Sequence, residues 1–273
     1  MTIRFYHNDG TRLRDVTEST KLPSMRGWWS SLAVGDFDRD GRPDLVAGNL
    51  GLNHGYVTSK DTVLGVYAGD FSNNLGTDVV LTQRIGKTEW PLTGMVPLGQ
   101  TIYTLGLKFP TYGAFAEATM PQLFPASQLQ KATHYEADTF ASVMLHNDGG
   151  GVFTATPLPD MAQLSPIRGI VVHDVDGDGH LDLIVAGNQY DAEPNTPRAD
   201  AGNGLWLRGD GHGHFTPVSP RQSGLLATRD VAGIALAGSP SGNTLIVANT
   251  GDTLQAFAVR RRAPAPPTTA SSH

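Results

Sequence analysis

Three acidic nonapeptides, each set between strand-like runs, limit the folds open to this chain. They carry oxygen-bearing side chains at positions 1, 3, 5 and 9, and we call them the first, second and third loops: DFDRDGRPD (36–44), DFSNNLGTD (70–78) and DVDGDGHLD (174–182). Apolar or alternating residues precede and follow each loop, a pattern typical of strands. The sequence therefore predicts a repeated strand–loop–strand unit and a fold of many short strands.

Composition excludes several other classes. With 32 Gly, 18 Pro and only 17% charged residues among 273, the chain is neither a coiled coil nor wholly disordered. No apolar run approaches about 18 residues, so we expect no membrane span. The absence of cysteine excludes disulfides, thiolate metal sites and a cysteine nucleophile. The net charge of −6 argues against a nucleic-acid partner and fits cation binding by clustered carboxylates.

Two further repeats support a β-rich fold. Asn-Asp-Gly or Gly-Asp-Gly turns between β-rich runs indicate hairpins, and they recur in FYHNDG (5–10), MLHNDG (144–149) and LWLRGDG (205–211). His7 and His146 fall in equivalent turns, where we expect solvated side chains. Residues 233–251 parallel residues 31–51 but have a shorter loop without carboxylates. We interpret this fourth unit as the same strand pair without a metal site.

One segment breaks the pattern. Residues 99–140 are rich in Ala and Gln, and Leu123, Phe124 and Leu129 follow roughly helical spacing. We expect two short helices there, inserted between β units and packed on the sheets. The chain is then one β domain over residues 1–262, followed by a disordered Pro/Thr/Ser tail at 263–273.

The loops have the chemistry of a calcium site. Calcium takes six to eight oxygen ligands from a flexible loop, and alternating aspartates direct their oxygens into one concavity. Gly41 and Gly179 at position 6 permit a sharp turn, and position 7 offers a backbone carbonyl. The second loop has only Asp70 and Asp78 as charges, so we expect it to bind more weakly or not at all.

Two other kinds of loop share parts of this pattern. An EF-hand requires Glu at position 12 and flanking helices, but that position holds Ala47 in the first loop and Val185 in the third, both in strand-like runs. The EF-hand is therefore rejected. The second alternative is a set of Asx-turns without metal, which stays open.

The pattern DxDxDGxxD followed by DLxxGN resembles the FG-GAP/VCBS repeat, the calcium-loop blade of β-propellers also seen in integrin α chains. NLGLN (49–53) and the stretches 141–191 and 204–215 resemble the C-terminal region of large bacterial VCBS-repeat proteins of the ASPIC/UnbV type. The resemblance covers most of residues 5–260. It implies a β-propeller, of which four to five blade-like units are visible, with the helical insertion near 99–140.

The resemblance also implies a ligand set, in which each loop joins the first two strands of a blade. It implies calcium at two strong sites and one weaker site. The implied ligands are Asp36, Asp38, Asp40 and Asp44 with the Arg42 carbonyl; Asp174, Asp176, Asp178 and Asp182 with the His180 carbonyl; and, more weakly, Asp70, Ser72, Asn74 and Asp78 with the Gly76 carbonyl.

These observations favour a calcium-stabilised binding or scaffold module for a protein or carbohydrate ligand, with no catalytic residues. One alternative is a glycan-active hydrolase or lyase that uses carboxylates such as Asp191, Glu193 and Asp200. Another is a C-terminal fragment of a larger propeller without independent function. The start, MTIRFYHNDGTRLRD, lacks the apolar region of a signal peptide. The resemblance nevertheless implies an extracellular, periplasmic or outer-surface location.

Overall fold

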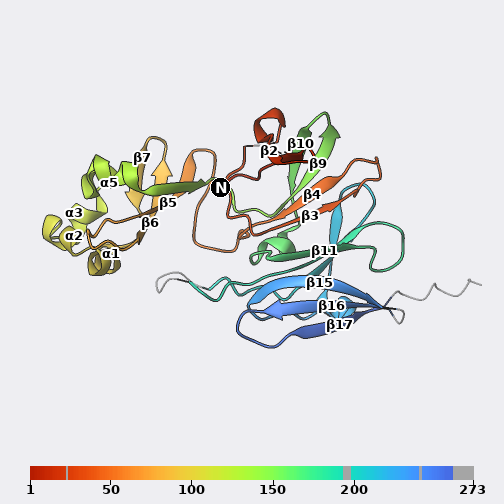
Figure 1. Cartoon of the computed structure of the whole chain (residues 1–273). Coiled ribbons are helices and arrows are strands. Elements are labelled where there is room, and N and C mark those ends of the chain that lie inside the picture. The colour runs from red at the N-terminus through yellow and green to blue at the C-terminus, as the bar shows by residue number, and fades with distance from the viewer. Residues whose placement is uncertain (23, 193–197, 240–241, 261–273) are drawn as a thin grey trace, which may run out of the picture. The chain divides into compact units, whose positions relative to one another are not determined.

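A computed structural model describes residues 1–22, 24–192, 198–239 and 242–260 (Figure 1). Within them the chain is mostly β, with five antiparallel sheets and short helices, which confirms the all-β expectation. The expected tail at 263–273 lies outside the described residues. Chain contacts divide the molecule into two compact units. Unit 1 comprises Met1–Thr17, Ser24–Trp29 and Gly55–Phe140, and unit 2 the described parts of Glu18–Pro23, Ser30–His54 and Ala141–His273.

Unit 2 contains two four-stranded sheets of similar design. One has the order β10-β9-β4-β3, built from β3 (Ser31–Gly35), β4 (Asp44–Gly48), β9 (Val143–Gly149) and β10 (Val152–Pro157). The other has the order β11-β12-β13-β14, built from β11 (Gly169–His173), β12 (Asp182–Ala186), β13 (Leu205–Gly209) and β14 (Phe215–Val218). The first loop joins β3 to β4 and the third joins β11 to β12, so each connects the first two strands of its sheet, as predicted.

A third sheet completes unit 2. Its strands are β15 (Val231–Ser239), β16 (Gly242–Asn249) and β17 (Gln255–Val259) in that order (Figure 1). The first two form the strand pair expected at 233–251, and the residues at its turn, 240–241, lie outside the described part. Strand β11 contacts both β3 and β15, so the first strands of the three sheets are neighbours. Closure of such sheets into a propeller ring stays a prediction.

The core of unit 2 follows from the strand patterns. Strand β12 is buried along its whole length, as expected of an inner strand covered on both faces. Its Leu183 and Val185 pack with Val46 and Leu207 from neighbouring strands. Two single-turn helices, η2 (Asp160–Gln163) and α6 (Pro220–Ser223), follow the outer strands of the two four-stranded sheets.

Unit 1 holds a hairpin, a sheet and a group of helices. The hairpin pairs β1 (Tyr6–Asn8) with β2 (Leu13–Asp15) and is followed by η1 (Thr17–Ser19). The sheet has the order β7-β6-β5-β8, with β5 (Thr62–Gly69), β6 (Asp78–Ile85), β7 (Thr88–Pro91) and β8 (Thr133–Ala137). The second loop joins β5 to β6, which are the two central strands of this sheet.

The expected helical segment is present, but the number of helices differs from the prediction. Five short helices replace the two expected: α1 (Met95–Thr101), α2 (Tyr103–Lys108), α3 (Tyr112–Ala116), α4 (Met120–Leu123) and α5 (Ala126–Lys131). Thr111 and Thr119 are N-cap residues, so α3 and α4 begin as separate helices within the segment. The helical segment buries Leu123 and Phe124 against Phe71 of the second loop and Val80 of β6. No helix among the described residues is long and apolar enough to cross a membrane.

The sheet and helices of unit 1 form an insertion within a sheet of unit 2. Strands β4 and β9 are hydrogen-bonded neighbours, yet residues 49–142 separate them along the chain. The two ends of this excursion are joined by Asn49 and Ser142, both fully buried, since the Asn49 N–H donates to Ser142 Oγ at 3.0 Å. Gln163 Nε2 donates to the Ser142 carbonyl at 2.9 Å, which fixes the same point.

Candidate metal centres in the acidic loops

All three loops share one backbone conformation. Positions 4 and 6 have positive φ in each: Arg39 and Gly41, Asn73 and Leu75, Gly177 and Gly179. Glycine adopts this region freely, whereas a leucine there is strained. Leu75 is 97% exposed, so packing does not hold it in place. The glycine at Gly76 in the second loop is therefore one residue away from the position that requires it.

The shared conformation is held by the loop aspartates. The carboxylate at position 1 accepts from the N–H at position 6 in each case: Asp36 from Gly41, Asp70 from Leu75, and Asp174 from Gly179, each at 3.1 Å. The side chain at position 5 accepts from the N–H at position 7, as Asp178 does from His180 at 2.8 Å. The bonds from position 7 to position 5 are Asx-turn bonds. Together with the longer bonds from position 6 to position 1, they hold the loop backbone in its conformation.

The aspartate at position 9 is buried and links the loop to the third strand of its sheet. Asp182 is 0% exposed and accepts from the N–H of Val175 at 3.0 Å and from that of Gly209 at 2.8 Å. Asp44 is also 0% exposed, and accepts from Phe37 at 3.2 Å and Asn147 at 2.8 Å. The two loops are thus fixed by matching contacts in two sheets.

These contacts gather the predicted ligands of the first and third loops. Carboxylate oxygens of Asp174, Asp176 and Asp182 all lie within 4.8 Å of one another, and so do those of Asp36, Asp38 and Asp40. Such oxygen groups suit a hard cation such as calcium. Asp178 is outside its group, and the second loop forms no group of this kind among the described residues. Metal binding by the carbonyls of Arg42, Gly76 and His180 stays a prediction.

Two arginine side chains form ion pairs with carboxylates of these loops. Arg42 forms an ion pair with Asp40. Arg208 Nε lies 2.8 Å from Asp176 Oδ2. The carboxylates therefore need positive charge, which either these side chains or a metal ion can supply. Arg39 of the first loop also donates to the Gly179 carbonyl, so the first and third loops are adjacent.

Burial disfavours the ionised form of Asp182. It raises the pKa of this carboxyl above its usual value, the N–H groups of Gly209 and Val175 oppose the rise, and the carboxylate of Asp176 adds to it. A cation held between Asp176 and Asp182 would oppose this rise, because a nearby positive charge favours the ionised carboxylates. The residues of the third loop therefore fit a bound calcium ion.

The second loop keeps the form of the others with less charge. Asp78 is buried and accepts from the N–H groups of Phe71 at 2.9 Å and Ser72 at 2.7 Å. Ser72 Oγ is shielded from solvent and has no hydrogen-bond partner among the described residues. Asn74 Oδ1 accepts from Gly76 N at 2.7 Å. Two neutral groups stand where the other loops have carboxylates, and a weaker metal site in the second loop stays a prediction.

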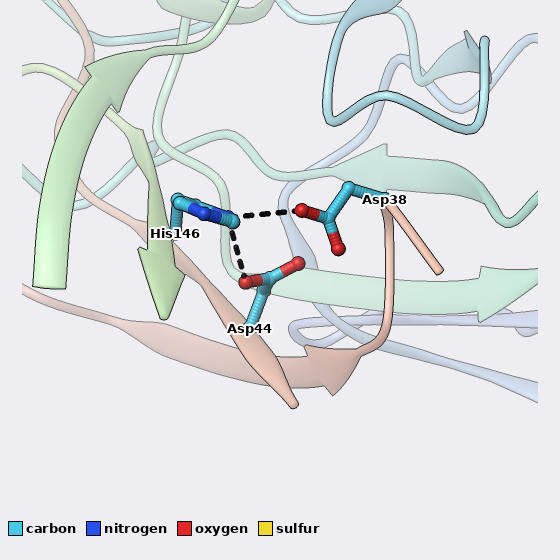
Figure 2. A group of neighbouring side chains, drawn as sticks. All are labelled: Asp38, Asp44 and His146. Carbon is cyan, nitrogen blue, oxygen red and sulfur yellow. Dashed lines mark ion pairs between the residues drawn. The ribbon is translucent and has the colours of Figure 1, made fainter. Parts of the chain in front are cut away.

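His146 is not the solvated turn residue expected from the sequence. Its Nδ1 lies 3.2 Å from Asp44 Oδ1 and 3.5 Å from Asp38 Oδ2, so it joins the first loop (Figure 2). The strand register explains this: Leu45 pairs with Leu145, which places His146 opposite Asp44. In the other sheet Leu183 pairs with Leu207, which places Arg208 opposite Asp182. Aligning MLHNDG with WLRGDG could have revealed this shared position.

A cleft lies beside the third loop. It has a volume of about 980 Å³ and is lined by residues of β12, β13, β14, α6, β16 and β17, among them Asp176, Trp206, Arg208, Gln222, Phe257 and Arg260. The guanidinium of Arg208 lies over the Trp206 ring at 5.1 Å. The carboxylates named for a glycan-active enzyme are elsewhere: Asp191 and Asp200 join no acidic group among the described residues, and Glu193 lies outside them.

Comparison with known proteins supports one repeat. The family profile described as an FG-GAP-like repeat matches residues 1–47, a segment that includes β3, the first loop and β4 up to Ala47. No curated protein matches the chain. The finer resemblance to VCBS and ASPIC/UnbV proteins is not shown by this match.

Leu75→Gly should stabilise the protein. The substitution removes the strain of a leucine at positive φ, which costs roughly 1 kcal/mol, and loses little packing. Glycine also raises the conformational entropy of the unfolded chain, which opposes the gain by about 0.4–1 kcal/mol, so the free energy of unfolding in urea should rise by only about 0.5 kcal/mol. The control is Leu254→Gly, an exposed residue without positive φ, which should be neutral or destabilising. If the two substitutions change the free energy of unfolding equally, Leu75 is not strained by its positive φ at position 6.

Asp182→Asn should change the pH dependence of metal-free stability. Because the folded-state pKa is raised, Asp182 stabilises the fold below the unfolded value of about 4, and this contribution is lost as pH rises through the folded-state pKa. In EDTA, the free energy of unfolding of the wild type relative to the variant should fall as pH rises.

The control for this experiment has the opposite sign. The pKa of Asp252 is lowered, chiefly by the N–H of Thr253, so the stability it contributes is present above about 4 and is lost as pH falls. The control variant is therefore Asp252→Asn. Urea unfolding at a series of pH values measures the stability of Asp182→Asn and of Asp252→Asn against the wild type. A wild type and Asp182→Asn variant with parallel profiles would show that burial does not raise this pKa.

Proposed function

We propose that this protein is a non-catalytic, β-propeller-like binding module whose acidic loops bind calcium. The observation that carries the proposal is the buried aspartate at position 9, which closes a loop of carboxylates in the same way in two sheets of unit 2. The FG-GAP-like repeat over residues 1–47 supports it, because that match spans the first loop.

The third loop is the strongest calcium candidate. Asp174, Asp176, Asp178 and Asp182 would supply carboxylate oxygens, and His180 a carbonyl. Calcium would supply a divalent charge that offsets their mutual repulsion and the burial of Asp182. The first loop offers Asp36, Asp38, Asp40 and Asp44 with the Arg42 carbonyl. The second loop, with Asp70 and Asp78, ranks last. An extracellular or cell-surface location would keep such sites filled.

The cleft beside the third loop is the proposed ligand site. Its volume is in the range of small-molecule sites, and aromatic side chains share its lining with two arginines. Asp176 pairs with Arg208, whereas Arg260 forms no ion pair within the described part of the chain, so Arg260 is the lining cation that most favours an anionic ligand. We assign the ligand as an acidic carbohydrate, whose carboxylates suit guanidinium groups and whose rings suit Trp206 and Phe257.

Calcium should raise the thermal unfolding midpoint of the purified chain, relative to excess EDTA and to magnesium. A site filled at 100 times its Kd adds about 2.7 kcal/mol to stability. Asp174→Ala should reduce the calcium-dependent shift more than Asp70→Ala does. Equal or reversed effects would refute the ranking of the loops. No calcium shift in the wild type would refute the calcium proposal.

Acidic oligosaccharides should bind the calcium-loaded protein. Calorimetric titration with oligogalacturonate should give saturable binding, while a neutral cello-oligosaccharide of equal length should not bind. Arg260→Gln should weaken the binding about tenfold, as loss of one charge-assisted hydrogen bond predicts. Arg229→Gln is the control, since that arginine pairs with Asp252 outside the cleft lining. Binding of neither sugar, or no effect of Arg260→Gln, would refute the assignment.

A further inference from the structure

The first loop differs from the third in one ligand-bearing side chain. Asp38, Asp44 and His146 each offer a donor atom, and the three atoms lie within 4.8 Å of one another (Figure 2). They come from the loop, the start of β4 and the neighbouring strand β9. We propose that these three residues bind a transition-metal ion of the zinc class, in preference to calcium.

The distances fit such an ion. His146 Nδ1 is 3.2 Å from Asp44 Oδ1 and 3.5 Å from Asp38 Oδ2. Ligands of a tetrahedral ion with bonds of about 2.0–2.1 Å are about 3.3 Å apart. Imidazole is a favoured ligand of zinc, copper, nickel and cobalt, whereas calcium takes oxygen ligands. Three protein ligands leave one position for water.

The second ring nitrogen of His146, Nε2, lies near another carboxylate, that of Asp148. His146 Nε2 lies 3.4 Å from Asp148 Oδ1, and Asp148 Oδ2 accepts from Thr154 Oγ1 at 2.7 Å. A histidine that binds metal through one nitrogen commonly donates its other N–H to a carboxylate, which fixes ring and tautomer. In the tautomer that carries its proton on Nε2, the nitrogen near Asp148, Nδ1 presents a lone pair to two carboxylates. A metal ion between them turns this repulsion into coordination.

The matching position in the other sheet shows why the third loop differs. Arg208 stands opposite Asp182 as His146 stands opposite Asp44. A guanidinium has no lone pair for a metal, so the third loop keeps an all-oxygen donor set. The first loop would therefore prefer a zinc-class ion, and the third loop would prefer calcium. Asp38 and Asp44 also belong to the proposed calcium ligands, so calcium and the zinc-class ion would compete for the first loop. Only this competition rests on the proposed function.

Cobalt(II) is the probe, since its visible spectrum distinguishes tetrahedral nitrogen–oxygen sites from octahedral oxygen sites. The untagged full chain should give tetrahedral bands at one equivalent of cobalt, and zinc should displace them. His146→Gln should lose the bands and weaken zinc binding at least tenfold in calorimetry. His7→Gln is the matched control, because His7 lies in the same HNDG sequence, is exposed, and should leave both unchanged. An unaltered spectrum in His146→Gln overturns the proposal.

Two further measurements separate folding and calcium effects from the site. Asp148→Asn removes only the carboxylate near Nε2, so it should keep the fold and weaken zinc binding about 10-fold or more. Unchanged zinc affinity in this variant would overturn the role of Asp148 as a positioning residue. The calcium-dependent thermal shift from the third loop should persist in His146→Gln. Cobalt bands that depend on His146 without any calcium shift would refute the proposed calcium function and retain this site.

Discussion

The loops depend on a buried carboxylate at their last position. Asp44 and Asp182 are 0% exposed, and each is held by one N–H from its own loop and one from the third strand of its sheet. Charged groups this deep are stable only when their oxygens are satisfied. The contacts therefore fix the loop, the hairpin and the third strand together, and they set where every other ligand of the loop can lie.

The third-strand position opposite this carboxylate distinguishes the two sheets. His146 brings a ligand atom to the first loop, and Arg208 brings a fixed positive charge to the third. Arg208 also lines the cleft beside the third loop, so one side chain connects the acidic group to the proposed ligand site. Occupation of Asp176 by calcium would weaken its pair with Arg208 and leave the guanidinium to a ligand in the cleft.

The sequence predicted those features that depend on local spacing. The acidic loops, their flanking strands and the strand pair near 233–251 are all encoded within short stretches, and the structure has them. His146 and Arg208 were missed because their role comes from pairing between strands that are distant in the chain. The number of helices was wrong because Thr111 and Thr119 each start a new helix inside a stretch of uniform composition. Leu75 took the position expected for glycine because the loop's hydrogen bonds outweigh its strain.

The insertion between β4 and β9 has a consequence for the order of events during synthesis. Those strands pair directly, yet β9 leaves the ribosome only after the whole excursion of residues 49–142 has been made. Loop-closure entropy grows only slowly with length, so the long connection weakens the finished sheet little. It does raise the mean sequence separation of contacts, which slows folding. Until β9 arrives, the edge of β4 lacks its partner strand and Asp44 lacks the N–H of Asn147, and the nascent chain exposes both.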